Sequence, residues 1–254
     1  DAAWRRRRVA LRMLAAYHSY VAATAPEAVT QVRLIAKPGM RSLYEKAGYV
    51  RRGPFGAYTE DPNSVFMEKP GLPTGYTLRV AGLADVGELD LLIGASARGV
   101  GAQHYAEAVI EGALQGSFGV DTQLLRDGTY FAVEHHGRIV AAGGWGRRRT
   151  LFGSDARSGR EPELLDPNID RARIRAFFVH PDHVRRGLGT ALLCASEAAA
   201  RKEGFLGFEM MATLTGRPLY QRFGYVGDTA IHHPVGENLT IEFYPMARTD
   251  VLPK

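Results

Sequence analysis

The stretch Val179-His-Pro-Asp-His-Val-Arg-Arg-Gly-Leu-Gly-Thr190 decides how this chain folds. The apolar run at residues 174–179 is typical of a β-strand, and residues 191–200 have a helical pattern. A strand, a glycine-bearing loop and a helix N-terminus make a socket for a phosphate, because the first N–H groups of a helix have no partner within it. Gly187 and Gly189 leave room for a ligand to approach the backbone. We therefore expect a phosphate-bearing ligand at this loop.

Two common glycine motifs do not fit the loop. The P-loop needs a lysine after its last glycine, and no lysine follows Gly189; the dinucleotide fingerprint needs a third glycine where Leu192 stands. The loop instead resembles the acyl-CoA loop of the GNAT superfamily of acyltransferases, Gln/Arg-x-x-Gly-x-Gly/Ala at a strand-to-helix turn. Gly187, Leu188 and Gly189 match its last three positions, whereas Val184 stands where Gln or Arg is usual.

A second motif follows about one helix and one strand downstream. Residues 205–212 form a strand-like apolar run, and the chain continues into a segment that ends at Val226. In the GNAT superfamily the strand after the acyl-CoA helix leads to a short helix with the pattern Leu/Phe-Tyr-x-x-x-Gly-Phe/Tyr. The residues that match this pattern are Leu219, Tyr220, Gly224 and Tyr225. With both motifs present, the resemblance covers residues 75–247.

The rest of the pattern predicts a mixed α/β sheet rather than an all-parallel one. The expected elements are a strand at 76–80, helices within 83–112 around the interruption Gly99-Val-Gly101, a hairpin at 129–145 with the turn His135-His136-Gly137, a long polar loop at 147–170, and a closing hairpin after the second motif. This order resembles that of the acyl-CoA N-acyltransferase fold of the GNAT superfamily.

The N-terminal segment contains an internal repeat of the second motif. At a constant offset, Ala36, Arg41, Leu43, Tyr44, Gly48, Tyr49 and Val50 recur as Ala212, Arg217, Leu219, Tyr220, Gly224, Tyr225 and Val226. We expect residues 1–70 to be a partial, degenerate GNAT-like half-domain, residues 71–75 a linker, and residues 76–254 the catalytic domain. The stretch at 5–10 that corresponds to the phosphate loop has no glycine, so we expect the half-domain to bind no CoA and to pack through a helix face near Leu11, Leu14 and Tyr17.

Composition limits the range of functions. The chain has 254 residues, enough for one or two domains, and no apolar run long enough to cross a bilayer. Arg12 breaks the N-terminal apolar stretch, so we expect no signal peptide. The single cysteine, Cys194, rules out an intramolecular disulfide and favours the cytoplasm. The histidines, including His180 and His183 beside the loop, lack the spacing of a zinc site, so we expect no metal.

The net charge of +5 suggests two kinds of partner. Arginine runs at residues 5–8 and 147–149 invite a nucleic-acid interpretation, but the chain lacks an interleaved aromatic and basic pattern. A polyanionic cofactor also benefits from a positive field. We expect acetyl-CoA and an amine substrate as partners. The alternatives are a non-catalytic acyl-CoA-binding pseudoenzyme and a basic nucleic-acid-associated module, and a homodimer is left open.

The resemblance implies a role for each matched residue. Backbone groups of Phe178 and Val179 hold the thioester arm of the cofactor like an added strand. The residues at the phosphate loop are Val184, Arg185, Arg186, Gly187, Leu188, Gly189 and Thr190. Tyr220 matches the tyrosine that protonates the departing thiolate. Many members carry a general-base glutamate where this chain has Arg173, so the base has to come from elsewhere: Glu209 on the next strand, Glu134, or a water.

Overall fold

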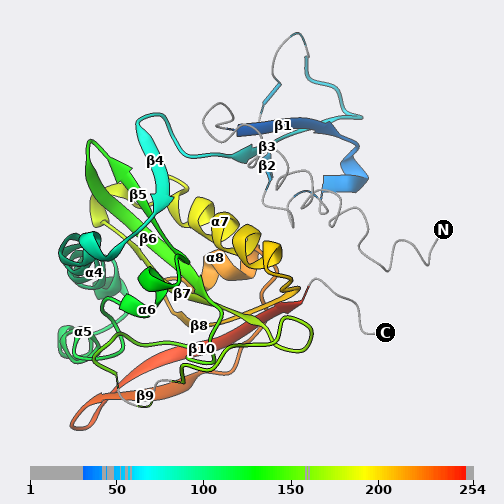
Figure 1. Ribbon diagram of the computed structural model, residues 1–254. Coiled ribbons are helices and arrows are strands. Elements are labelled where there is room, and N and C mark those ends of the chain that lie inside the picture. The colour runs from blue at the N-terminus through cyan, green and yellow to red at the C-terminus, as the bar shows by residue number, and fades with distance from the viewer. Residues whose placement is uncertain are drawn as a thin grey trace.

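The computed structural model describes residues 31–249, apart from 42–43, 45–48, 52, 55–56, 58, 158 and 160. The predicted helix face near Leu11, Leu14 and Tyr17 lies outside the described residues. The described part contains a small three-stranded sheet and a seven-stranded sheet, and the small sheet lies to one side of the larger one (Figure 1). None of the helices in the described residues is long and apolar enough to span a membrane.

The large sheet has the strand order β4-β5-β6-β7-β8-β10-β9. Its strands are β4 (Tyr76–Val80), β5 (Tyr130–His135), β6 (Arg138–Gly146), β7 (Ala172–Val179), β8 (Gly207–Thr213), β9 (Ile231–Gly236) and β10 (Leu239–Thr249). Every neighbouring pair is antiparallel except β7 and β8, which are parallel. The sheet is therefore mixed, as the sequence predicts, and the expected strand at 76–80 and both hairpins are confirmed.

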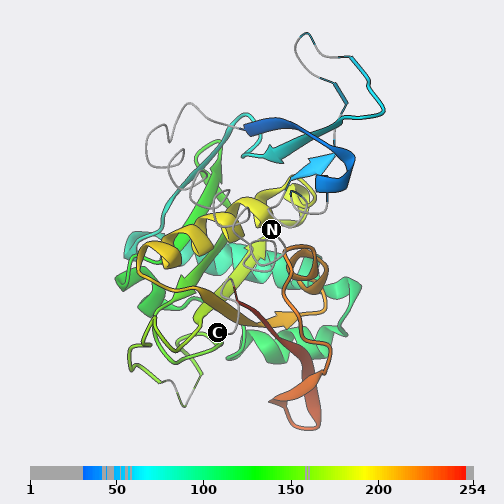
Figure 2. The ribbon, with the colours of Figure 1, turned by 90° about the vertical axis from the view of Figure 1, so that its right-hand side faces the viewer.

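Helices cover both faces of this sheet. They are α4 (Val86–Gly99), α5 (Glu107–Leu114), α6 (Thr122–Arg126), α7 (Leu188–Lys202) and α8 (Arg217–Arg222), with short 3-10 helices η2 (Leu83–Asp85), η3 (Gly101–Gln103) and η4 (Pro181–His183). One face packs on α7 and α8, and the other on α4, α5 and α6 (Figures 1 and 2). The interruption predicted at Gly99–Gly101 is the junction between α4 and η3.

The core beneath α7 explains why this helix lies flat on the sheet. Leu188, Leu192 and Leu193 share one side of α7 and are almost completely buried. They pack against the strand residues Ile174 and Phe208. This packing fixes the N-terminus of α7 directly beyond the end of β7, and so places the glycine loop in space.

The small sheet has the order β1-β3-β2, with β1 (Gln31–Ala36), β2 (Val50–Arg51) and β3 (Val65–Pro70), and a 3-10 helix η1 (Pro38–Met40). All of its pairings are antiparallel. The strands predicted near residues 32–36 and 64–68 are therefore present. The segment after β3 leads directly into β4 of the large sheet (Figure 1).

Candidate functional site

The parallel strands β7 and β8 separate soon after they meet. Their ladder consists of Ala172 with Phe208 and Arg173 with Glu209, although β7 runs on to Val179 and β8 to Thr213. Beyond this short ladder the two strands no longer share hydrogen bonds, so one edge of β7 faces a gap in the sheet. An extended ligand can add to such an edge through backbone hydrogen bonds.

A bulge bends β7 at the point where it leaves β8. The pairing with β6 jumps from Ala142–Phe178 to Gly144–Arg175, so two residues of β7 lie opposite Gly143. One of them, Ala176, has a φ of 55°, which is rare for a residue with a side chain. The hydroxyl of Tyr130 donates to the carbonyl of Ala176 at 2.7 Å and holds the bulge in place. Sequence reasoning missed this pair, because a bulge has no signal in a strand pattern.

The two sides of the bulged strand face different environments. The ring of Phe177 lies on the α7 side, with its centroid 6.2 Å from that of Tyr220. Phe178 lies on the opposite side, with its ring centroid 5.8 Å from that of Phe118. Phe118 belongs to an aromatic group with Phe152, from the loop between β6 and β7, and Phe243 of β10. The gap is therefore walled by aromatic rings on both faces of the sheet.

The amide of Val179 already has a polar partner in this gap. Its N–H donates to the Oγ of Ser96, on α4, over 3.2 Å. Ser96 is buried, and the next amide, that of His180, pairs with Val140 of β6 instead. Ser96 therefore marks a position where an oxygen accepts from the free edge of β7. Sequence reasoning did not identify Ser96, since a serine within a helix pattern carries no such signal.

The phosphate loop adopts the conformation that its glycines predict. Arg185 and Gly187 both have left-handed backbone, with φ of 61° and 82°. Such alternation turns successive N–H groups toward one point, which forms an anion-binding concavity. Helix α7 begins at Leu188, and its N-cap Gly187 has no side chain to cap the first N–H groups. Arg185 and Arg186 are exposed beside it.

The loop also contacts the helix that carries Tyr220. A Cβ added at Gly189 would lie 3.2 Å from Cδ2 of Leu219, so α8 packs closely on the start of α7. The side chain of Leu188 is 1% exposed and belongs to the core, so only its backbone can meet a ligand. Val184 is half-buried at the C-cap of η4, and Thr190 is half-buried in the first turn of α7. The structure thus brings the loop residues and the second motif together.

Tyr220 is 7% exposed, and its hydroxyl has no hydrogen-bond partner among the described residues. Burial raises the pKa of Tyr220 above its ordinary value, because it disfavours the phenolate. The side chain therefore keeps its proton at neutral pH and can donate it. Tyr225 is held differently, by a hydrogen bond of 2.9 Å from its hydroxyl to buried Glu197.

Glu209 lies at the closed end of the gap. Its carboxylate pairs with Arg173 across the β7–β8 ladder, and with Arg171 at 3.6 Å. Glu134, the other carboxylate considered, accepts from Arg79 at 2.7 Å. Both glutamates are therefore engaged by arginines rather than free at the open end of β7. These pairings favour a structural role for the Glu209 carboxylate.

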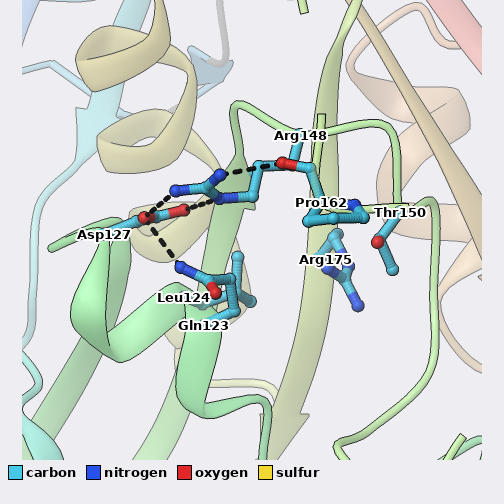
Figure 3. A pocket seen from close by; sticks show the side chains of 8 residues that line it. Gln123, Leu124, Asp127, Arg148, Thr150, Pro162 and Arg175 are labelled. Atoms are coloured by element: carbon cyan, nitrogen blue, oxygen red, sulfur yellow. Dashed lines mark hydrogen bonds and ion pairs between the residues drawn. The ribbon is translucent and has the colours of Figure 1, made fainter. Parts of the chain in front are cut away.

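A cavity of about 40 Å³ lies elsewhere, among α6, β6, β7 and the loop that follows β6 (Figure 3). Arg148 and Gln123 both bond to Asp127 at its rim, at 2.8 Å and 3.0 Å. A volume of this size holds one or a few waters rather than a cofactor. The described residues contain no group of three or more His, Cys, Asp or Glu side chains suited to holding a metal ion.

The open edge of β7, the glycine loop and the buried tyrosine lie close together at one end of the gap between β7 and β8. Comparison with known proteins gives one family for this region. Residues 126–227 match the family model for the acetyltransferase (GNAT) domain. This stretch of the chain is therefore similar to the acetyltransferase (GNAT) domain.

Individual relatives are distant or match only in part. An IAA acetyltransferase of Azospirillum brasilense is 62% identical over 29 residues, which are 11% of this chain and 19% of that protein. The GCN5-related N-acetyltransferase from Rhodopseudomonas palustris is similar in structure, with a TM-score of 0.51 and 19% sequence identity. The alignment covers 69% of this chain and 96% of that chain. The PaiA N-acetyltransferase from Thermoplasma acidophilum, in complex with coenzyme A, has 12% identity, 68% and 98% coverage, and a TM-score of 0.47.

Proposed function

We propose that this chain is an N-acetyltransferase that moves an acetyl group from acetyl-CoA to a primary amine of a small molecule or peptide. The observation that carries the proposal is the gap between β7 and β8 together with the left-handed glycine loop at its open end. The pyrophosphate would lie on the N–H groups of residues 185–190. The pantetheine arm would run along Phe178 and Val179. One of its carbonyl oxygens would replace Ser96 Oγ as the acceptor of the hydrogen bond from the Val179 amide.

The residues around the gap supply the chemistry of direct transfer. The amine nitrogen attacks the thioester carbonyl carbon, and the resulting oxyanion needs an N–H donor such as those of β7. The C–S bond then breaks, and the thiolate takes the proton of Tyr220, which its burial has kept on the phenol. Solvent returns a proton to Tyr220 after CoA leaves.

The attacking amine must also lose a proton. Glu209 and Glu134 are both paired with arginines, so we propose that a water in the gap carries this proton away. The amine would approach past the aromatic group of Phe118, Phe152 and Phe243. We further propose that the protein acts in the cytoplasm, where its single Cys194 stays reduced.

An amine-panel assay tests the proposal. Purified protein is mixed with acetyl-CoA and one amine at a time, covering diamines, aromatic amines and peptides with a free N-terminus, and CoA release is followed with a thiol reagent. Amine-dependent release that exceeds the hydrolysis measured without amine supports the proposed function. Tight acetyl-CoA binding without release for any amine would instead identify a pseudoenzyme.

A further inference from the structure

Four histidines gather beside the phosphate loop, from two distant parts of the chain. His135 is the last residue of β5, and His136 follows it in the turn to β6. His180 directly precedes η4, and His183 is the last residue of η4. The ring centroids of His135 and His183 lie 5.2 Å apart, and those of His180 and His183 lie 5.8 Å apart. The β6–β7 pairing creates this cluster, because it sets the start of β6 beside the end of β7.

Tyr76 of β4 holds two of these rings. Its ring stacks on His135 with centroids 4.4 Å apart, and its hydroxyl lies 2.8 Å from Nδ1 of His183. When the Tyr76 hydroxyl donates to Nδ1, neutral His183 carries its proton on Nε2. The Nε2–H group is then available as a donor.

The charges around the cluster are mostly positive. The positive charge of Arg186 repels the protonated forms of both His135 and His183, and Arg185 is exposed in the same loop. Arg138 lies across the β5–β6 ladder from His135. The one acidic neighbour is Asp182, whose exposed carboxylate lies 3.8 Å from Nδ1 of His180, among the described residues. An anion that enters here meets several donors and little opposing charge.

Loss of solvent around the rings, followed by repulsion from neighbouring histidines and Arg186, lowers the pKa of His183 below its ordinary value of 6.5. The pKa of His135 is lowered by the same causes. Both rings are therefore neutral at pH 7 in the free protein. A bound dianion reverses the balance, because it favours the protonated imidazole; the affinity for such an anion then rises as the pH falls toward the histidine pKa in the complex.

We propose that His135, His180, His183 and Arg186 form a subsite for the phosphomonoester of the acyl-CoA co-substrate, its 3′-phosphate. The inference rests on the proposed function, since the α7 N-terminus is taken to hold the pyrophosphate. A phosphomonoester has two charges and three acceptor oxygens, which suits a group of imidazole and guanidinium donors. The two diester phosphates have no proton to lose near neutral pH, so a pH-dependent, proton-linked contribution identifies the phosphomonoester.

Calorimetry with CoA and 3′-dephospho-CoA, on protein treated with a chelator, tests the subsite. We expect CoA to bind about tenfold more tightly than dephospho-CoA at about pH 6, because one charge-assisted hydrogen bond contributes about this much affinity. The ratio of the two affinities should be smaller at about pH 8. Measurements in buffers of different ionisation heat should show proton uptake with CoA and less with dephospho-CoA. Equal affinities at both pH values overturn the proposal.

Variants show whether the pH dependence of the affinity ratio comes from the histidines or from ionisation of the ligand itself. In a His135→Gln, His183→Gln double variant that keeps its circular-dichroism spectrum, the ratio of the two affinities at about pH 6 should fall well below that of the parent, because only His180 and Arg186 remain. His232→Gln, an exposed histidine on β9, should behave as the parent. A parent-like ratio in the double variant overturns the subsite. If CoA and dephospho-CoA bind with equal affinity, the subsite is refuted but the proposed function is not. If neither ligand binds, the proposed function is refuted as well.

Discussion

The small N-terminal sheet and the far end of the large sheet are built on the same plan. Glu68 of β3 pairs with both Arg33 and Val50, and Ala247 of β10 pairs with both Glu209 and Val226. Arg33 and Val50 are as far apart in the chain as Glu209 and Val226. The turns after β1 and β8 also correspond, in the hydrogen bonds Met40 N–H to Lys37 carbonyl and Gly216 N–H to Thr213 carbonyl.

The tyrosine pairs match as well. The amide of Tyr49 donates to the carbonyl of Tyr44 at 2.9 Å, and that of Tyr225 to Tyr220 at 3.1 Å. The ring centroids are 5.7 Å apart in the first pair and 6.0 Å in the second. We therefore propose that residues 1–70 are a degenerate half-domain of the same fold. The comparison teaches that strand register and the tyrosine turn form a scaffold common to both copies, and we propose that ligand binding needs the glycine loop, which the stretch at residues 5–10 lacks.

The largest expected effect separates the two matched tyrosines. Tyr220→Phe keeps the ring and its packing but removes the proton, so the chemical step should slow by at least about 100-fold, the lower range of general acid catalysis. Tyr44→Phe should leave it unchanged. Single-turnover kinetics is the measurement, because slow product release can hide the change in kcat. A chemical step in Tyr220→Phe as fast as in the parent would make Tyr220 a packed aromatic only.

A smaller effect should follow changes in the glycine loop. Gly187→Val forces a branched residue into the left-handed region, and Gly189→Val sets a side chain against Leu219. Each should weaken acetyl-CoA binding by at least about tenfold, which corresponds to roughly 1.4 kcal/mol. Gly39→Val, at a glycine of the first copy that has open space around it and no left-handed φ, is the control. Calorimetry on folded variants with unchanged affinity would refute the assignment.

The next prediction concerns the number of cofactors bound. Because the stretch at residues 5–10 has no glycine, we expect one acetyl-CoA for each chain in calorimetric titration, bound at the second copy. A stoichiometry near two would show that the first copy also binds. A titration of Gly187→Val would then show whether the site in the first copy still binds acetyl-CoA when the loop of the second copy is changed.

The smallest effect is expected at Glu209, which corresponds to Arg33 of the first copy. Its pairing with Arg173 and Arg171 favours a structural role, so Glu209→Gln should cost roughly 1 kcal/mol of unfolding free energy and leave the chemical step within about twofold. Thermal unfolding and single-turnover kinetics measure the two quantities. A loss of about 100-fold in the chemical step, without loss of folding, would instead make Glu209 the general base.

Local patterns were sufficient for much of the fold. The β7–loop–α7 unit, the β5–β6 hairpin and the tyrosine motif each depend on residues close together in the chain, so alternation, glycines and helical period predict them. Boundaries were less certain: α7 begins at Leu188, earlier than its apolar run at 191–200, because the helix starts directly after the left-handed Gly187. β8 begins at Gly207, two residues into the apolar run predicted to be a strand.

By itself, the sequence determined the resemblance to the GNAT domain, the mixed sheet, the loop at Gly187 and Gly189, and Tyr220 as the residue to test. Only the tertiary structure decided which distant groups meet: Tyr130 with the Ala176 bulge, Ser96 with Val179, and Tyr76 with His183. The physical reason is that such contacts depend on strand register and helix packing, which arise between segments far apart in the chain. A local pattern records what a residue prefers for itself, and it does not record which partner the folded chain brings to it.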